Sequence, residues 1–160
     1  MRIELCRLQN RLKIASLALA GMLVACATAQ AQDPVTADRE PLVEAYIAAL
    51  NECDSDKLGG LLHPEHKGFL IRGGVGDGMT DTALAVQCAA GFQLALSAIE
   101  TQWMQAPEAN VQTVALVLSG TLTHPKRGTN PNNLRVTLTA ERESSEAPLL
   151  IKHSHLSALQ

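Results

Sequence analysis

Near its end the chain reads Leu149-Leu150-Ile151-Lys152-His153-Ser154-His155-Leu156-Ser157, within residues 149–159, whose composition is typical of a β-strand. Successive side chains of a strand point to opposite faces, so His153 and His155 share one face. Their ring nitrogens can converge on a ligand, a carboxylate or a metal. They can equally bond to partners inside a sheet, and the residues alone leave both interpretations open.

Three more segments with the two-residue period of strands precede this one, and they cover residues 93–105, 111–123 and 134–142. In the third, Leu134, Val136, Leu138 and Ala140 alternate with polar residues. Residues 124–133 contain two prolines and a glycine, which predicts a turn, and residues 144–148 predict a second hairpin loop. We therefore expect four antiparallel strands.

The first half of the folded part has helical spacing instead. The segment 41–52 has one apolar face, Asp54 and Asp56 introduce a second helix over 57–62, and a third runs from 80 or 81 to 91. Between the last two lie a strand-like stretch (67–72) and a glycine-rich loop (73–78). His63-Pro64-Glu65-His66 is expected to be a solvated turn at a helix end. Three helices and four strands predict an α+β fold, with helices packed on one face of a curved antiparallel sheet.

The N-terminus has the order of a secretory signal. Residues 1–13 are basic, an uncharged apolar run covers 14–25, and small and polar residues follow to 32. Ala29-Gln30-Ala31 fits ordinary signal peptidase, which gives a leader of 1–31. Leu23-Val24-Ala25-Cys26 resembles a bacterial lipobox, which gives a leader of 1–25 and lipidation of Cys26. Either ending predicts export to a periplasm, where the protein would be free or membrane-anchored. A linker (32–39) and one domain (40–160) follow the leader.

Export changes what the cysteines can do. Cys6 and Cys26 belong to the leader, so the domain contains Cys53 and Cys88. In an oxidising compartment these two can form a disulfide that closes a long loop, or they can be two separately buried thiols. The helix-end position of Cys53 favours the disulfide.

Composition and charge exclude several classes of function. The chain is 46% hydrophobic, enough for a core, but only 2% aromatic, which argues against a base-stacking surface. The formal net charge is −3; residues 1–13 contribute +3, so the remainder carries −6 and is a poor partner for nucleic acid. We expect no nucleic-acid partner, no cofactor and no metal.

Two motifs at opposite ends of the domain resemble a known family. Tyr46-Ile47-Ala48-Ala49-Leu50-Asn51, followed by Asp54, Asp56 and Leu61-Leu62-His63-Pro64-Glu65, resembles the opening of ketosteroid isomerase. Residues 149–157 resemble the closing strand of SnoaL-like domains and of the association domain of calcium/calmodulin-dependent protein kinase II. All three belong to the nuclear transport factor 2-like superfamily. The resemblance implies a cone-shaped curved sheet with three N-terminal helices (also described as cystatin-like) around a pocket, and frequent dimerisation through the sheet.

The comparison with the isomerase itself is incomplete. Tyr46 matches its oxyanion-stabilising tyrosine, but the position of its general base falls on Leu70, and Glu65 and Asp77 are the nearest acids. The second aspartate of the isomerase has Glu141 as its nearest match. Proton abstraction needs both a base and a donor at the oxyanion. The sequence therefore argues against ketosteroid isomerisation.

The candidate ligand-binding residues are Tyr46, Trp103, Arg135, His153 and His155. The resemblance implies that the two histidines line or border the interior of the cone. Tyr46 can be a pocket residue or a core residue whose hydroxyl reaches a polar partner. Arg135 can counter an anionic ligand or be a surface charge.

Three hypotheses for function remain. The first is an exported domain that binds a small organic molecule in the cone without catalysis. The second is a lyase, isomerase or hydrolase that uses a histidine as general base and Tyr46 as acid. The third is a homodimeric scaffold without a working pocket. A homodimer is expected in all three cases.

Overall fold

The computed structural model describes residues 38–70, 74–76 and 79–159. The predicted signal peptide, the lipidation site at Cys26 and residues 32–37 of the predicted linker lie outside this part. Within it, no helix has the length and apolar character needed to cross a membrane.

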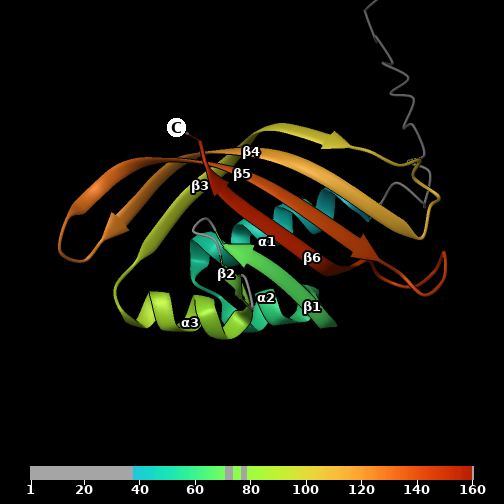
Figure 1. Cartoon of the computed structure of the whole chain (residues 1–160), viewed down its shortest axis with the longest axis horizontal. Helices are drawn as coiled ribbons and strands as arrows, with labels where there is room; N and C mark the ends of the chain where they lie inside the picture. Colours follow the sequence, from blue (N-terminus) through green and yellow to red (C-terminus); the bar gives the residue numbers. More distant parts are fainter. Residues whose placement is uncertain (1–37, 71–73, 77–78, 160) are drawn as a thin grey trace, which may run out of the picture. The chain divides into compact units, whose positions relative to one another are not determined.

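Three helices and six strands make up the described domain (Figure 1). In chain order they are α1 (Arg39–Glu52), α2 (Ser55–Leu61), β1 (Leu62–Leu70), β2 (Gly74–Gly76), α3 (Asp81–Ala89), β3 (Gln93–Trp103), β4 (Val111–His124), β5 (Gly128–Glu141) and β6 (Leu150–Ala158).

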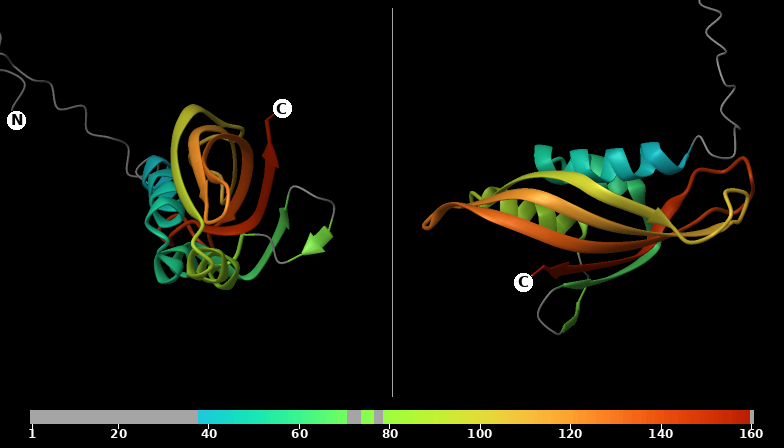
Figure 2. Two further views of the ribbon diagram at one scale, coloured as in Figure 1. Left: turned by 90° about the vertical axis from the view of Figure 1, so that its left-hand side faces the viewer. Right: turned by 90° about the horizontal axis from the view of Figure 1, so that it is seen from above.

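The strands form one sheet in the order β2-β1-β6-β5-β4-β3, with β2 and β3 at its edges. All neighbours are antiparallel except β1 and β6, which run parallel, so the sheet is mixed. Figure 2 shows that the long strands β3 to β5 bend strongly and that α1 lies alongside β3. This confirms the predicted α+β class with helices against a curved sheet, and it corrects the expectation of a purely antiparallel one.

The helices begin and end where their sequences provide caps. The Asp54 side chain accepts a hydrogen bond from the Lys57 N–H at the start of α2, and Thr80 does the same for the Ala83 N–H at the start of α3. Helix α1 ends at Cys53, whose φ of 56° places it in the left-handed region.

Alternation along the strands divides the sheet into two faces. We call the face packed against the helices the helix-covered face and the other the helix-free face. On β4 and β5 the buried side chains follow the two-residue period and belong to the helix-covered face: Gln112, Val114, Leu116, Leu118, Leu134, Val136, Leu138 and Ala140. They pack against buried residues of α1 to form the core, with Tyr46 and Leu50 both 0% exposed.

Strand β6 contains a bulge that reverses its alternation. His153 pairs with Thr139 and Ile151 pairs with Ala140, so Lys152 is an extra residue on β6. Ile151 and Ser154, three residues apart, are therefore both buried on the helix-covered face. His153 and His155 are exposed on the helix-free face.

Two predicted turns differ from the structure. The chain does reverse within 124–133, but the turn is shorter than predicted, because β4 and β5 continue to a tight reversal in which the Arg127 N–H donates to the His124 carbonyl. Pro131 is tolerated because it lies beyond Leu134, where pairing of β5 with β6 ends. The predicted solvated turn at 63–66 is wrong, since these residues belong to β1 beside β6.

The predicted disulfide is confirmed. Cys53 and Cys88 are bonded, with their Cα atoms 5.9 Å apart and a sequence separation of 35. The bond joins the end of α1 to α3.

Candidate functional site

Three polar side chains from three elements lie at the interior of the domain. Tyr46 comes from the buried side of α1, His66 from β1 and Ser154 from the helix-covered face of β6. Tyr46 and Ser154 are 0% and 1% exposed, and His66 is partly buried. Tyr46 and Ser154 thus place buried hydroxyls, and His66 a partly buried imidazole, on the helix-covered side of the sheet.

His66 and Ser154 are directly bonded. The His66 Nε2 and the Ser154 Oγ are 2.9 Å apart. The other ring nitrogen of His66, Nδ1, is buried and has no hydrogen-bond partner among the described residues. Burial lowers the pKa of His66, and the nearby charges of His153 and Lys67 lower it further. The imidazole is therefore neutral at neutral pH.

Tyr46 has a buried hydroxyl that no described residue satisfies. Its oxygen has no hydrogen-bond partner there, and burial raises the pKa of the phenol far above its ordinary value. The hydroxyl thus remains protonated and can donate. A buried donor without a partner costs about 1–3 kcal/mol, which a bound acceptor would recover.

The two histidines proposed from sequence do not face this interior. His153 and His155 do share one face, as expected, but it is the exposed, helix-free face. His155 lies edge-on to Phe69 of β1, with ring centroids 6.5 Å apart. The bulge at Lys152 is the physical reason for the difference, because continuous alternation from Ile151 would have turned both imidazoles inward.

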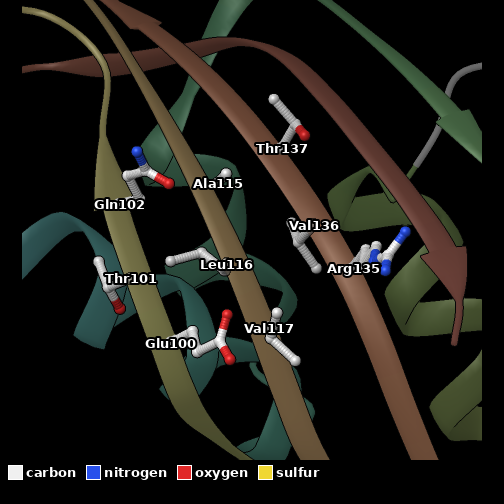
Figure 3. Close-up of a pocket in the computed structure, with 9 residues that line it drawn as sticks. All are labelled: Glu100, Thr101, Gln102, Ala115, Leu116, Val117, Arg135, Val136 and Thr137. Carbon is white, nitrogen blue, oxygen red and sulfur yellow. The ribbon is translucent and has the colours of Figure 1, made fainter.

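Arg135 also lies on the helix-free face, in a hollow of about 550 Å³ (Figure 3). Glu100 of β3 and Arg135 of β5 both pair with Val117 of β4, so the three residues form one row across the sheet. Gln102 and Thr137 belong to the next row of the same hollow. The hollow thus offers a carboxylate, a guanidinium and neutral polar groups, all from exposed positions except the half-buried Thr137.

Trp103, at the end of β3, lies beside Arg39, whose hydrogen bonds connect structural elements. The Arg39 guanidinium lies 4.9 Å from the centre of its ring. Arg39 donates to the Gln105 carbonyl and to the Gln112 side chain. Arg142, 3% exposed, donates to the carbonyls of Pro107 and Ala109. This group ties the start of α1 to the loop between β3 and β4.

The five residues proposed from sequence therefore lie in three places: Tyr46 in the interior, Trp103 in the Arg39 neighbourhood, and Arg135, His153 and His155 on the helix-free face. Sequence reasoning missed His66 and Ser154. The signal for Ser154 is its place in the closing strand, but its orientation depends on the bulge. His66 gave no signal of its own, because its pairing with β6 is long-range.

Among the acids considered from sequence, the two that the structure describes lie outside the interior. Glu141 is bonded to Lys152 at 2.6 Å, and the Glu65 side chain is 74% exposed. Among the described residues no carboxylate is buried, and no three His, Cys, Asp or Glu side chains gather into a metal-binding group. Asp77 lies outside the described residues.

Comparisons with known proteins identify the fold of this chain but not its function. No family model matches the chain, and no curated protein does. A nuclear transport factor 2-like protein of Rhodospirillum rubrum, described as of unknown function in nutrient uptake, is 20% identical with a TM-score of 0.62 over 76% of this chain and 98% of its own. A ketosteroid isomerase-like protein of Erwinia carotovora atroseptica is 15% identical with a TM-score of 0.61, over 78% and 96%.

This chain has the nuclear transport factor 2-like fold. An uncharacterised protein of Caulobacter vibrioides with a cystatin-like fold agrees, at 15% identity and a TM-score of 0.64 over 80% of this chain and 92% of that one. The nuclear transport factor 2-like fold hosts many functions, so the site must carry the functional argument.

Proposed function

We propose that this protein is an exported binding domain that holds a small organic molecule beneath its helices without transforming it. The observation that carries the proposal is the buried Tyr46 hydroxyl without a partner, together with the free Nδ1 of His66. Buried polar groups in folded proteins nearly always have partners, so the absence of one at both atoms favours a ligand that pairs with them.

The chemistry of these groups restricts the ligand. Tyr46 is a donor, since its raised pKa keeps the phenol protonated. His66 uses Nε2 on Ser154, which leaves Nδ1 as a donor or an acceptor according to tautomer. The core to which Tyr46 belongs is otherwise apolar and includes Leu50, Leu138 and Ile151. The expected ligand is a largely apolar molecule with a carbonyl or hydroxyl oxygen.

Native mass spectrometry of the protein purified from its own cells tests the proposal. A bound small molecule is expected, released on denaturation and lost in Tyr46→Phe and in His66→Phe. His153→Ala is the matched control, because that imidazole lies on the helix-free face. An empty protein, or a bound molecule that depends on His153 rather than Tyr46, would contradict it.

Catalysis is the second candidate, and one observation favours it. A neutral histidine bonded to a serine hydroxyl is the arrangement of a base and a nucleophile or a proton relay. Tyr46 would then act as the acid. Turnover of an ester or carbonyl compound that disappears in Ser154→Ala and in His66→Gln would establish this hypothesis in place of simple binding.

Export and dimerisation complete the proposal. The N-terminal pattern of residues 1–31 supports export, by a free or a lipid-anchored route. If Cys26 carries a lipid anchor, the Cys26→Ala variant should leave the membrane fraction. Fractionation of cells that express wild type and Cys26→Ala tests this.

The row Glu100–Val117–Arg135, with both charged side chains exposed, supports a two-fold dimer, since each Arg135 can meet the other copy's Glu100. Arg135→Glu should weaken such a dimer in analytical ultracentrifugation.

A further inference from the structure

A groove of about 640 Å³ lies between α1 and β3, and neither Tyr46 nor Arg135 lines it. Its apolar lining comes from both elements: Val43, Ile47, Ala48, Leu96, Ala98 and Trp103. The Asn51 side chain makes two hydrogen bonds to the backbone of Leu96, each 2.8 Å long. This amide pairing holds α1 at a fixed distance from the edge strand, so the groove is already formed in the free protein.

One rim of the groove is acidic. Glu40, Glu44 and Glu52 line it from α1 at spacings of four and eight residues. Like charges four residues apart on a helix repel each other. Lys57 compensates Glu52 at 3.0 Å, but Glu40 and Glu44 make no ion pair with any described residue, and no cationic side chain lines the groove.

We propose that this groove binds an aliphatic diamine or polyamine. Its ammonium groups would pair with Glu40 and Glu44, and its methylene chain would lie on Val43 and Ile47. One helical turn separates the two carboxylates by about 6 Å along the axis, which matches the ammonium spacing of short diamines such as putrescine.

Other ligand classes fit the groove less well. An anion would be repelled by the rim. A neutral apolar molecule would take water from Glu40 and Glu44 without replacing it, which is unfavourable for charged groups. A monoamine would leave one of the two carboxylates uncompensated. The volume itself lies within the range of small-molecule sites, roughly 300–1,000 Å³.

Calorimetric titration of the full protein with putrescine, spermidine and n-butylamine, at low ionic strength, tests this assignment. Spermidine and putrescine are expected to bind more tightly than n-butylamine. Glu44→Gln should weaken putrescine binding roughly threefold and the Glu40→Gln/Glu44→Gln double variant roughly tenfold, as for partly exposed ion pairs. Glu146→Gln is the matched control, since it removes the same charge from the exposed loop before β6.

Three results would overturn the proposal. The first is equal weakening by Glu44→Gln and Glu146→Gln, which indicates general charge attraction. The second is n-butylamine binding as tightly as putrescine. The third is a basic amphipathic peptide that binds where diamines do not, which would make the groove a protein-docking site. Thermal melting verifies that the exposed glutamine variants fold. Tyr46→Phe should leave diamine binding unchanged, which separates this groove from the interior site.

Discussion

His66 Nε2 lies 2.9 Å from Ser154 Oγ, although 88 residues separate them in the chain. The parallel pairing of β1 with β6 brings these side chains together on the helix-covered face. This contact places a neutral imidazole and a hydroxyl inside a domain whose other interior side chains are mostly apolar. It therefore marks the polar end of the proposed ligand site.

Tyr46→Phe should separate binding from stability. Because the hydroxyl has no partner among the described residues, its removal is expected to change the free energy of unfolding by less than about 0.5 kcal/mol or to raise it. The same variant should bind the native ligand roughly tenfold more weakly, the effect of one lost hydrogen bond. Urea denaturation of the ligand-free protein supplies the first measurement. A large loss of stability there would indicate that the hydroxyl has a structural role instead.

His66 should make stability depend on pH. Its pKa in the folded state is lowered from 6.5, chiefly by burial, so the unfolded chain binds a proton more readily below that pH. This contribution is complete above about pH 6.5 and is lost as the pH falls through that value toward the folded-state pKa. Melting temperatures of wild type and His66→Gln between pH 7.5 and 5 measure it. Equal slopes for the two proteins would refute the assignment, and His155→Gln, at an exposed position that does not contribute to the shift, serves as the control.

The disulfide should provide a large share of stability. A cross-link that closes a loop with 35 residues of separation is expected to contribute about 3–4 kcal/mol. Reduction with dithiothreitol should lower the melting temperature of wild type by roughly 10 °C or more. The Cys53→Ser/Cys88→Ser variant should melt at the reduced value and not respond to the reductant. A response by that variant would show that the reagent acts elsewhere.

Substitution of Arg142 should cost much more stability than substitution of Arg135. Arg135 lies on β5, and Arg142 follows directly after this strand. Arg142 is 3% exposed and donates to the Pro107 and Ala109 carbonyls, so Arg142→Met removes two hydrogen bonds from a buried charged group and should cost about 1.5–3 kcal/mol, while the Gln112 amide continues to donate to both carbonyls. Arg135 is exposed, and Arg135→Met should cost under about 0.5 kcal/mol. Chemical denaturation of both variants measures this difference, which would vanish if the loop carbonyls were solvated.

Gly120 should be intolerant of any side chain. A Cβ built there would lie 1.8 Å from the Ala95 carbonyl oxygen on the neighbouring strand, so Gly120→Ala must push β3 away from β4. We expect a loss of about 3 kcal/mol or more, or an insoluble protein. Gly60→Ala in α2 is the contrasting substitution, because nothing lies within 4 Å and alanine favours the helix. Its melting temperature should stay the same or rise.

Local sequence patterns were sufficient for most of the fold. The apolar spacing around Tyr46 placed α1, and the alternation from Leu134 to Ala140 placed the helix-covered side of β5 correctly. Strand β1 was harder to predict from the sequence. His63 and Pro64 resemble a helix end, and the strand forms beside β6, which is distant in the chain. The polar residues 129–133 likewise pair through the backbone, and their side chains carry no apolar period.

The candidate site was predicted less well, for one physical reason. The sequence shows that His153 and His155 share a face but not which face, because that depends on a single extra residue in the ladder between Thr139 and Ala140. Tyr46 required no such information, as a helix face is fixed by its apolar neighbours. His66 could not be predicted as a site residue, because the orientation of its partner Ser154 depends on the same bulge.

The bulge at Lys152 also determines which polar groups lie inside the domain. Since β6 carries two histidines on one side and a serine on the other, a change of ladder register by one residue would exchange imidazoles for hydroxyl inside the domain, with every side chain retained. A deletion of one residue at Lys152 would thus change the chemistry offered to a ligand without any substitution in the interior.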